Sequence, residues 1–548
     1  MSDPGWWRSA VVYQVYPRSF ADHDGDGTGD VQGVISRLDY LHELGVDALW
    51  ISPLYLSPLH DGGYDVADYR QIDPRFGSLD DVRQLLDEAH ALGIRILFDL
   101  VPNHTSIDHA WFQEVLGDPP GSPSWDRYVI REGKGARHEL PPNNWESVFH
   151  GAAWSPLVSQ GSPTGHWYLH LFDVTQPDLN WDNPEVRQEF HSILRFWFDL
   201  GIDGFRIDVA HGLIKAPSLP DAVIDVAHPE SDLNRPFWDQ EGVHEIYREW
   251  RRIADAYLEP RVFCGEVWDV TEERLARYLR SDELHTCFDF AYLYAGWDAL
   301  AMREVIDQTL ATHAAVGAPP TWVLSNHDVI RHRTRLAPVA DGVADLDRGL
   351  DRARAATLFL LSLPGSAYIY QGEELGLTEV TELPPELRED PAWLRSGGTD
   401  GVRDGCRVPI PWTRIAPSHG FNDSGESWLP QPVSWAGLSV TAQREDPDST
   451  LSFYRRALHI RRAEGSLGDG RLEWIEVAAE GVLAIKRIDE ALGVTSIINT
   501  GEHLVHLPAA LGTDVLIASG DAVAIVDTDE GSHLVLGAET AVWIRSQQ

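Results

Sequence analysis

Lysine is nearly absent from this chain of 548 residues. Only Lys134, Lys215 and Lys486 occur, and arginine supplies almost all of the positive charge. Acidic residues outnumber basic ones, and the formal net charge is −41. Nucleic acids and anionic membranes bind proteins through clustered positive charge, so we expect neither as a partner. The simplest interpretation of the acidic excess is a solubilising surface.

Cysteines and long apolar runs are also scarce. The three cysteines, Cys264, Cys287 and Cys406, are too few and too scattered for a disulfide framework. The first two lie in apolar runs, which is typical of small core residues. No apolar run approaches the roughly 20 residues of a transmembrane helix, and the N-terminal residues lack the basic and then apolar pattern of a signal peptide. We therefore expect a cytoplasmic protein.

The chain does contain an alternation of strand-like and helix-like segments. Strand patterns occur at residues 11–16, 48–52, 94–99, 202–208, 261–266, 322–325 and 367–370. Helical patterns occur at residues 31–44, 79–92, 186–200, 243–257 and 354–363. Such alternation predicts parallel pairing, and about eight units favour a closed (β/α)₈ barrel. A doubly wound open sheet is the alternative, but it usually has a glycine-rich phosphate turn, which we do not find.

The length predicts one large domain with smaller additions. Two stretches rich in Pro, Gly and Trp interrupt the alternation, at about 105–174 and 378–440. The first follows the third strand, so we expect an inserted irregular domain over the barrel mouth. From about residue 471 short strands replace helices, which predicts a C-terminal antiparallel β-sandwich at 471–548. Its strand patterns are at 482–488, 494–499, 515–518 and 534–544. The barrel would then comprise residues 1–104 and 175–470.

Three of the predicted strands lead into a carboxylate, at Asp208, Glu266 and Asp328. The strand ends of such a barrel converge on one mouth, so these side chains are expected to share a pocket, about two βα units apart in sequence. Like charges in a cleft raise each other's pKa, which makes the cluster costly unless it performs chemistry. Cleavage of a glycosidic bond needs this set: an ionised nucleophile, a protonated acid and charge beside a cationic sugar.

Each acid is weaker evidence by itself. Arg206 lies two residues before Asp208, so both side chains leave the strand on the same face. Its guanidinium would keep Asp208 ionised, as a nucleophile requires, but a buried ion pair at a strand end explains the pattern equally well. Glu266 could donate a proton near neutral pH only if its pKa were raised. Alone, it could be a surface residue at the start of a loop.

Five short motifs, in order along the chain, resemble glycoside hydrolase family 13, the α-amylase family. They are DLVPNH (99–104), QPDLN (176–180), GFRID (204–208), GEVW (265–268) and SNHD (325–328). The second is similar to the signature of the branch that contains α-glucosidases and oligo-1,6-glucosidases. The resemblance extends from about Trp7 to the C-terminal region.

The resemblance implies a role for each matching residue. Asp208 would form a covalent β-glucosyl-enzyme, Glu266 would be the general acid and then the base, and Asp328 would bind sugar hydroxyls. Asp61 and Arg407 would hold the hydroxyls of the non-reducing end, and Tyr64 would stack under the ring. Further substrate contacts are expected from Arg206, His104, His327, Gln176, Val209, Phe149 and Phe172. The two phenylalanines are favoured over any of the 21 tryptophans, most of which we expect to be packing residues.

The loop DHDGDGTGD (22–30) is a candidate metal site. Alternating oxygen ligands with intervening glycines suit a hard cation such as Ca²⁺. The loop is similar to the start of an EF-hand, but the twelfth position is Gly33 rather than Glu, and an acidic turn without metal is the alternative. The family resemblance implies a structural Ca²⁺ or Mg²⁺ on Asp22, Asp24, Asp26, Asp30 and the carbonyl of Thr28. It implies no catalytic cofactor.

These observations predict a retaining exo-α-glucosidase that releases glucose from short α-glucosides. Val209 favours α-1,6 linkages by resemblance, whereas AHG (210–212) and RDGCRVP (403–409) favour α-1,4 with relaxed linkage, which we prefer. An oligo-1,6-glucosidase and an α-glucosyl transferase using the same intermediate are the alternatives. A non-catalytic transporter-associated relative or a sugar-binding module is disfavoured, because all three acids are present. The sequence does not indicate the oligomeric state.

Overall fold

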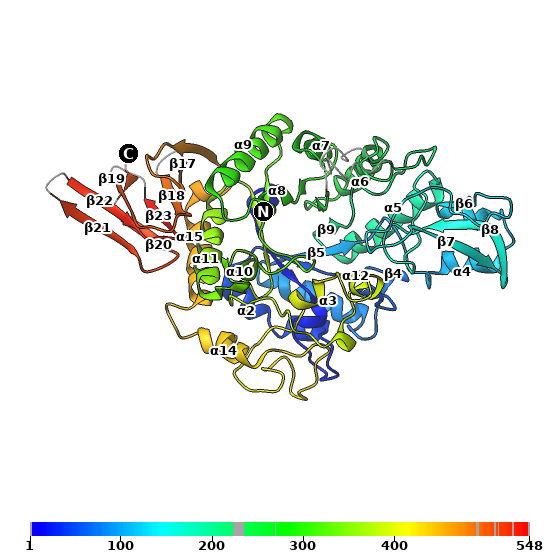
Figure 1. The fold of residues 1–548 in the computed structure, drawn as a ribbon, viewed down its shortest axis with the longest axis horizontal. Helices are drawn as coiled ribbons and strands as arrows, with labels where there is room; N and C mark the ends of the chain where they lie inside the picture. Colours follow the sequence, from blue (N-terminus) through cyan, green and yellow to red (C-terminus); the bar gives the residue numbers. More distant parts are fainter. Residues whose placement is uncertain are drawn as a thin grey trace.

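The computed structural model describes residues 3–222, 235–268, 270–488, 493–508, 511–512, 514–528 and 531–545. At its centre, eight parallel strands pair in the order β11-β10-β9-β5-β2-β1-β15-β12 (Figure 1). A parallel bridge between Asp289 and Trp322 connects the two ends of this row. The arrangement confirms the predicted (β/α)₈ barrel over an open sheet. The strands are β1 (Val11–Val15), β2 (Ala48–Ile51), β5 (Arg95–Leu100), β9 (Gly204–Ile207), β10 (Val262–Gly265), β11 (Thr286–Cys287), β12 (Thr321–Val323) and β15 (Ser366–Tyr370).

The barrel strands are buried on both faces, as parallel strands covered by helices must be. Alternate residues belong to two separate apolar clusters: Val12 and Trp50 pack in one, and Tyr13 and Leu49 in the other. This period of two follows from the pleat of the strand. The three cysteines are buried free thiols, as expected of core residues.

The helices that follow the barrel strands begin at conventional caps. Ser78 forms a capping box at the start of α3, and Asn183 caps α5 before Pro184. Among the described residues, no helix combines the length and apolar character that crossing a membrane requires. The helices around the barrel are α1 (Val31–Ile35), α2 (Leu38–Leu44), α3 (Leu79–Ala91), α5 (Pro184–Leu200), α6 (Val243–Ala254), α7 (Glu272–Tyr278), α8 (Phe290–Tyr294), α9 (Ala299–Val316), α11 (Leu346–Ser362) and α15 (Thr450–Ala463).

Several predicted boundaries were wrong. The helix predicted at 31–44 is two helices, α1 and α2, and Arg37 at the break stacks on Trp412 at 4.4 Å. Strands β9 and β10 are direct neighbours, so Asp208 and Glu266 are one βα unit apart rather than two. The extra length lies in the long segment of sequence between the end of β9 and the start of α6. Strand β12 ends at Val323, which places Asp328 in the following loop.

Two additions lie at opposite ends of the long axis of the molecule (Figure 1). The first, between β5 and α5, is more regular than predicted: it contains α4 (Ala110–Gly117) and an antiparallel sheet of β6 (Ile130–Glu132), β8 (Ser162–Leu169) and β7 (Trp154–Ser159). The second consists of two antiparallel sheets, ordered β16-β17-β18-β23-β20 and β19-β22-β21. Within the C-terminal domain predicted at 471–548, residues 489–492, 509–510, 513, 529–530 and 546–548 lie outside the described residues.

The patterns predicted at 482–488, 494–499 and 515–518 correspond to β17, β18 and β20, and a turn divides the pattern at 534–544 into β22 and β23. Strands β16, β19 and β21 were not predicted. Glu539 in this turn has a φ of 53°, which ends the extended run. The bounds are β16 (Arg471–Ile475), β17 (Val482–Ile488), β18 (Gly493–Asn499), β19 (Val505–Pro508), β20 (Asp514–Ala518), β21 (Val523–Thr528), β22 (Gly531–Leu536) and β23 (Thr540–Arg545).

Candidate active site

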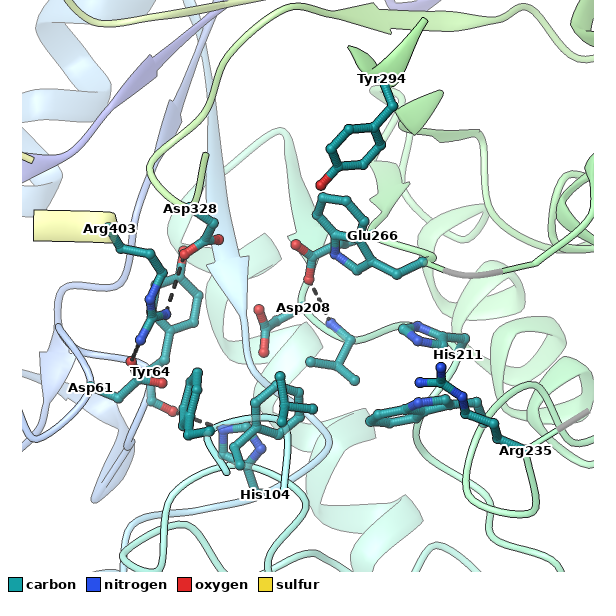
Figure 2. A pocket seen from close by; sticks show the side chains of 16 residues that line it. Asp61, Tyr64, His104, Asp208, His211, Arg235, Glu266, Tyr294, Asp328 and Arg403 are labelled. Carbon is teal, nitrogen blue, oxygen red and sulfur yellow. Dashed lines mark hydrogen bonds and ion pairs between the residues drawn. The ribbon is translucent and has the colours of Figure 1, made fainter. Parts of the chain in front are cut away.

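A cavity of about 530 Å³ contains the three carboxylates expected from the sequence, which follow the C-terminal ends of β9, β10 and β12 (Figure 2). This is the position where (β/α)₈ barrels place their active sites. The cavity is lined by Asp61, Tyr64, His104, Val148, Phe149, Phe172, Asp208, Val209, His211, Arg235, Trp238, Glu266, Trp268, Tyr294, Asp328 and Arg403.

One guanidinium holds three carboxylates at the base of the cavity. Nη1 of Arg206 lies 2.9 Å from Asp99 and 2.6 Å from Asp208, and Nη2 lies 2.5 Å from Glu266. Arg206 is fully buried. A single positive charge cannot balance three ionised carboxylates in a low dielectric, so the cluster favours binding a proton.

The pKa values of this cluster follow from that imbalance. Burial raises the pKa of Asp208, Arg206 lowers it, and the carboxylates of Glu266 and Asp99 raise it again, with a net upward shift. Burial likewise raises the pKa of Asp99 to about 6, against the opposing effect of Arg206. Arg206 pairs with Asp208 as predicted and lowers its pKa, but the guanidinium is shared with Asp99 and Glu266.

A strained turn positions Glu266. Val209 has a φ of 45°, which is unfavourable for a β-branched residue. In this conformation its N–H donates to Oε2 of Glu266 at 3.0 Å. The turn closes through a hydrogen bond from Gly212 N–H to the Val209 carbonyl at 2.9 Å. A Cβ at Gly212 would lie 2.7 Å from both the Trp238 ring and Val209, so only glycine fits there.

Asp328 lies in an ion-pair network at one end of the cavity. Nη2 of Arg407 is 2.9 Å and Nη1 of Arg403 is 3.3 Å from its Oδ1, and Nε2 of His327 is 3.1 Å from Oδ2. Although burial opposes this, these three groups hold the pKa of Asp328 below its usual range. Asp328 is therefore a carboxylate at neutral pH.

The sequence analysis predicted that Asp61 and Arg407 together hold the non-reducing end of the substrate, but the two side chains are not paired in the structure. Arg403, not Arg407, contacts Asp61, with Nη2 at 2.9 Å from Oδ1. Arg403 begins the single helical turn α13 (Arg403–Cys406) and Arg407 follows it. Both reach Asp328, but only Arg403 lines the cavity. Arg407 instead donates to the His327 carbonyl at 2.8 Å.

Four further predicted residues lie beside this network. Tyr64 donates its hydroxyl to Asp99 at 2.8 Å and stacks on His327 with ring centroids 5.1 Å apart. His104 donates to the Tyr64 carbonyl at 3.1 Å, and Gln176 donates to Asp61 at 3.0 Å. Four of the predicted substrate contacts therefore lie behind the cavity wall rather than on it: Arg206, His327, Gln176 and Arg407.

The acidic loop gathers three of its predicted ligands. Carboxylate oxygens of Asp22, Asp24 and Asp30 lie within 4.8 Å of one another, the only such group of metal-binding side chains within the described ranges. Asp26 does not belong to the group, and its carboxylate accepts from Thr28 N–H at 2.7 Å. The three clustered oxygens form a donor set that fits a hard cation such as Ca²⁺.

The model of the α-amylase catalytic domain matches residues 14–470. The chain belongs to the α-amylase family. It is similar to a probable α-glucosidase of Rhizobium meliloti, with 39% identity over 492 residues and 86% of each chain covered. It is also similar to an oligo-1,6-glucosidase of Parageobacillus thermoglucosidasius, with 36% identity over 488 residues, 83% of this chain and 84% of the relative. Among solved structures, the α-glucosyl transfer enzyme XgtA superposes with a TM-score of 0.87 at 36% identity, covering 99% of both chains.

Several cavity residues of this α-amylase-family hydrolase escaped the sequence analysis. His211 and Trp268 closely follow Asp208 and Glu266, so their proximity to the acids was the available signal. The other missed residues come from loops or from the ends of short helices, where no recognisable pattern occurs: Val148, Arg235, Trp238, Tyr294 and Arg403. Phe149 and Phe172 line the cavity as predicted.

Proposed function

We propose that this protein is a retaining exo-α-glucosidase that releases glucose from the non-reducing end of short α-glucosides. The observation that carries the proposal is the juxtaposition of Asp208 and Glu266 on two nitrogens of one guanidinium, in the same cavity as Asp328. Retention requires the nucleophile and the acid to be close, about 5–5.5 Å apart, whereas inversion needs room for a water between them. The relatives named as glucosidases support the same class of reaction.

The residues divide the reaction into two displacements. The Asp208 carboxylate attacks the anomeric carbon, the bond to the leaving oxygen breaks, and the Glu266 carboxyl gives its proton to that oxygen. A water oxygen then attacks the same carbon, the bond to Asp208 breaks, and the water proton returns to Glu266. Val209 N–H and Arg206 hold Glu266 in place for both steps. The first step requires Glu266 to carry a proton and Asp208 to be ionised.

The ion pairs of Arg403 support removal of one terminal glucose at a time. Asp61, Arg403 and Asp328 form a closed wall of charged groups at one end of the cavity. Carboxylates and a guanidinium are strong partners for sugar hydroxyls. A chain that continued past this wall would have to displace buried ion pairs, which is costly.

The linkage and the acceptor belong to the same proposal. We favour α-1,4 substrates with relaxed linkage, and transfer of glucose to a second sugar as the alternative outcome of the same intermediate. The similarity to an α-glucosyl transfer enzyme supports transfer as the alternative reaction. Linkage preference and transfer can be measured together, from the hydrolysis rates and the separated transfer products of maltose, isomaltose, nigerose, kojibiose, sucrose and trehalose. A clear preference for isomaltose, the α-1,6 substrate, would contradict the proposed α-1,4 preference.

Removing the nucleophile tests the mechanism. Asp208→Ala should lower the rate of glucose release by at least about 10⁴-fold. Azide should then restore turnover of an activated α-glucoside and produce the β-glucosyl azide, because azide attacks from the face that Asp208 occupied. Asp255→Ala, a change at the end of α6, is the matched control and should retain full activity. Undiminished glucose release by Asp208→Ala would show that the assignment is wrong.

We also propose a structural Ca²⁺ or Mg²⁺ at Asp22, Asp24 and Asp30. Such an ion would hold the loop and supply no chemistry to the sugar, because the loop does not line the cavity. Calcium should raise the melting temperature of the wild-type protein, and chelation should reverse the increase. Asp22→Asn should abolish the calcium response; an equal response in this variant would contradict the site.

A further inference from the structure

The cavity has a second end, on the far side of the catalytic acids from Asp61 and Arg403. Figure 2 shows His211 and Arg235 there, across Asp208 from the charged wall. The ring of Trp238, which contacts His211, lines this open end, and the ring of Trp268 lines the same cavity. If glucose occupies the charged end, as the proposed function requires, the leaving group and any acceptor must lie at the open end.

His211 is the polar side chain of the open end with an unsatisfied buried atom. Its exposed fraction is 3%, and its Nδ1 makes no hydrogen bond to any residue that the structure describes. Its ring packs against Trp238 with centroids 4.7 Å apart. Nδ1 is buried away from the cavity, whereas the His211 ring lines the cavity, so the nitrogen left for a ligand is Nε2.

The backbone around His211 is fixed on both sides. The His211 carbonyl accepts from Asp239 N–H at 2.7 Å, and Ala210 N–H donates to the Glu266 carbonyl at 2.8 Å. The ammonium of Lys215 donates to the Gly212 carbonyl at 2.6 Å. The imidazole is therefore held at a constant distance from the proton donor, which is what a positioned specificity contact requires.

The charge state of His211 limits what it can recognise. Burial lowers its pKa to about 4, and the nearby Lys215 and Arg235 add to that effect, while Asp239 and the Glu266 carbonyl oppose it. A neutral imidazole offers one donor and one acceptor. The nitrogen that meets the ligand is therefore a donor or an acceptor, depending on the tautomer, and a hydroxyl group is a partner for either.

We propose that His211 is the specificity-determining residue for the leaving group and the acceptor, and that it hydrogen-bonds a hydroxyl of a neutral sugar or polyol at the open end. The aromatic rings of Trp238 and Trp268 would pack against the apolar face of the same group. His211 forms no covalent bond and takes no proton; the proton transfers remain with Glu266. This inference rests on the proposed function and names the class of acceptor for its site.

Two substrates distinguish recognition of the leaving group by His211 from the bond-breaking steps. Maltose fills both ends of the cavity, whereas α-glucosyl fluoride has a leaving group too small to reach His211. His211→Phe keeps a ring against Trp238 but removes both nitrogens. It should lower kcat/KM on maltose by about 10-fold, the loss of one hydrogen bond of about 1.4 kcal/mol, and change kcat/KM on α-glucosyl fluoride less than 2-fold. The ratio of transfer to hydrolysis with added glucose should fall by a similar factor.

The controls distinguish recognition from packing. His211→Gln retains a donor and an acceptor and should recover part of the maltose activity. His313→Phe replaces another buried histidine with no hydrogen-bonded nitrogen, on α9 and outside the cavity, and should leave both substrates unaffected. Melting temperatures of all variants monitor the fold.

Each outcome is decisive. Equal losses of His211→Phe on both substrates, or an unchanged maltose rate, would overturn the inference. Failure of the proposed function would appear in the wild-type protein, as no turnover of α-glucosyl fluoride, whereas failure of the inference would appear only in the variants.

Discussion

The two ends of the cavity satisfy their polar groups in opposite ways. At the charged end, Arg403 contacts Asp61 at 2.9 Å, Asp390 at 2.8 Å and Asp328 at 3.3 Å. At the open end, His211 leaves a nitrogen unpaired among the described residues, and aromatic rings form much of the wall. One end is complete before a ligand arrives, and the other is not.

The difference indicates two kinds of recognition. Buried ion pairs are favourable only in one geometry, so the charged end should accept one sugar in one orientation. Aromatic faces and a single neutral hydrogen-bonding group impose fewer constraints, so the open end should accept several leaving groups. An enzyme strict about the glucose it removes and tolerant of its linkage fits this asymmetry.

Breaking the charged end should have the largest effect. Arg403→Met removes the positive charge from three carboxylates, two of them buried, and should cost about 3–5 kcal/mol of stability. It should also lower kcat/KM by about 10²-fold or more, equally on maltose and on α-glucosyl fluoride, because both use this end. Arg414→Met, at an exposed position, is the matched control. A loss confined to maltose would mean that the two ends have been assigned the wrong way round.

The acidic cluster between the two ends should control the pH dependence. The Asp99 carboxylate raises the pKa of Asp208, so its removal should lower that pKa. Because the nucleophile must be ionised, the acid limb of kcat/KM for Asp99→Asn should move to lower pH, by roughly one unit. The pH profile of kcat/KM on α-glucosyl fluoride measures this shift, and the open end does not contribute because the fluoride leaving group does not reach it. A shift to higher pH would contradict the shared-guanidinium account.

The smallest change in activity is expected from a substitution at Val209, which lies between the two ends of the cavity. Val209→Thr exchanges a methyl group for a hydroxyl beside Glu266 and should lower the ratio of α-1,6 to α-1,4 activity by less than about 10-fold. Its rate on α-glucosyl fluoride should be unchanged, since the charged end is intact. Measured rates on maltose and isomaltose give the ratio. An increase would reverse the linkage interpretation of this position.

Sequence patterns found the residues that lie on or directly after regular strands. Asp208 and Glu266 follow β9 and β10, where a strand period and a motif coincide. Asp328 was found through its motif alone, since β12 ends five residues earlier. Arg403 was missed because its contact with Asp61 joins residues 342 positions apart, and no local pattern encodes such a pairing.

The sequence by itself determined the barrel, the family and the three acids, because strand periodicity and short motifs are local properties of the chain. Only the tertiary structure decided that one guanidinium serves Asp99, Asp208 and Glu266, and that Arg403 rather than Arg407 reaches Asp61. Charge sharing and ion-pair choice depend on the distances between distant loops, and folding alone sets those distances.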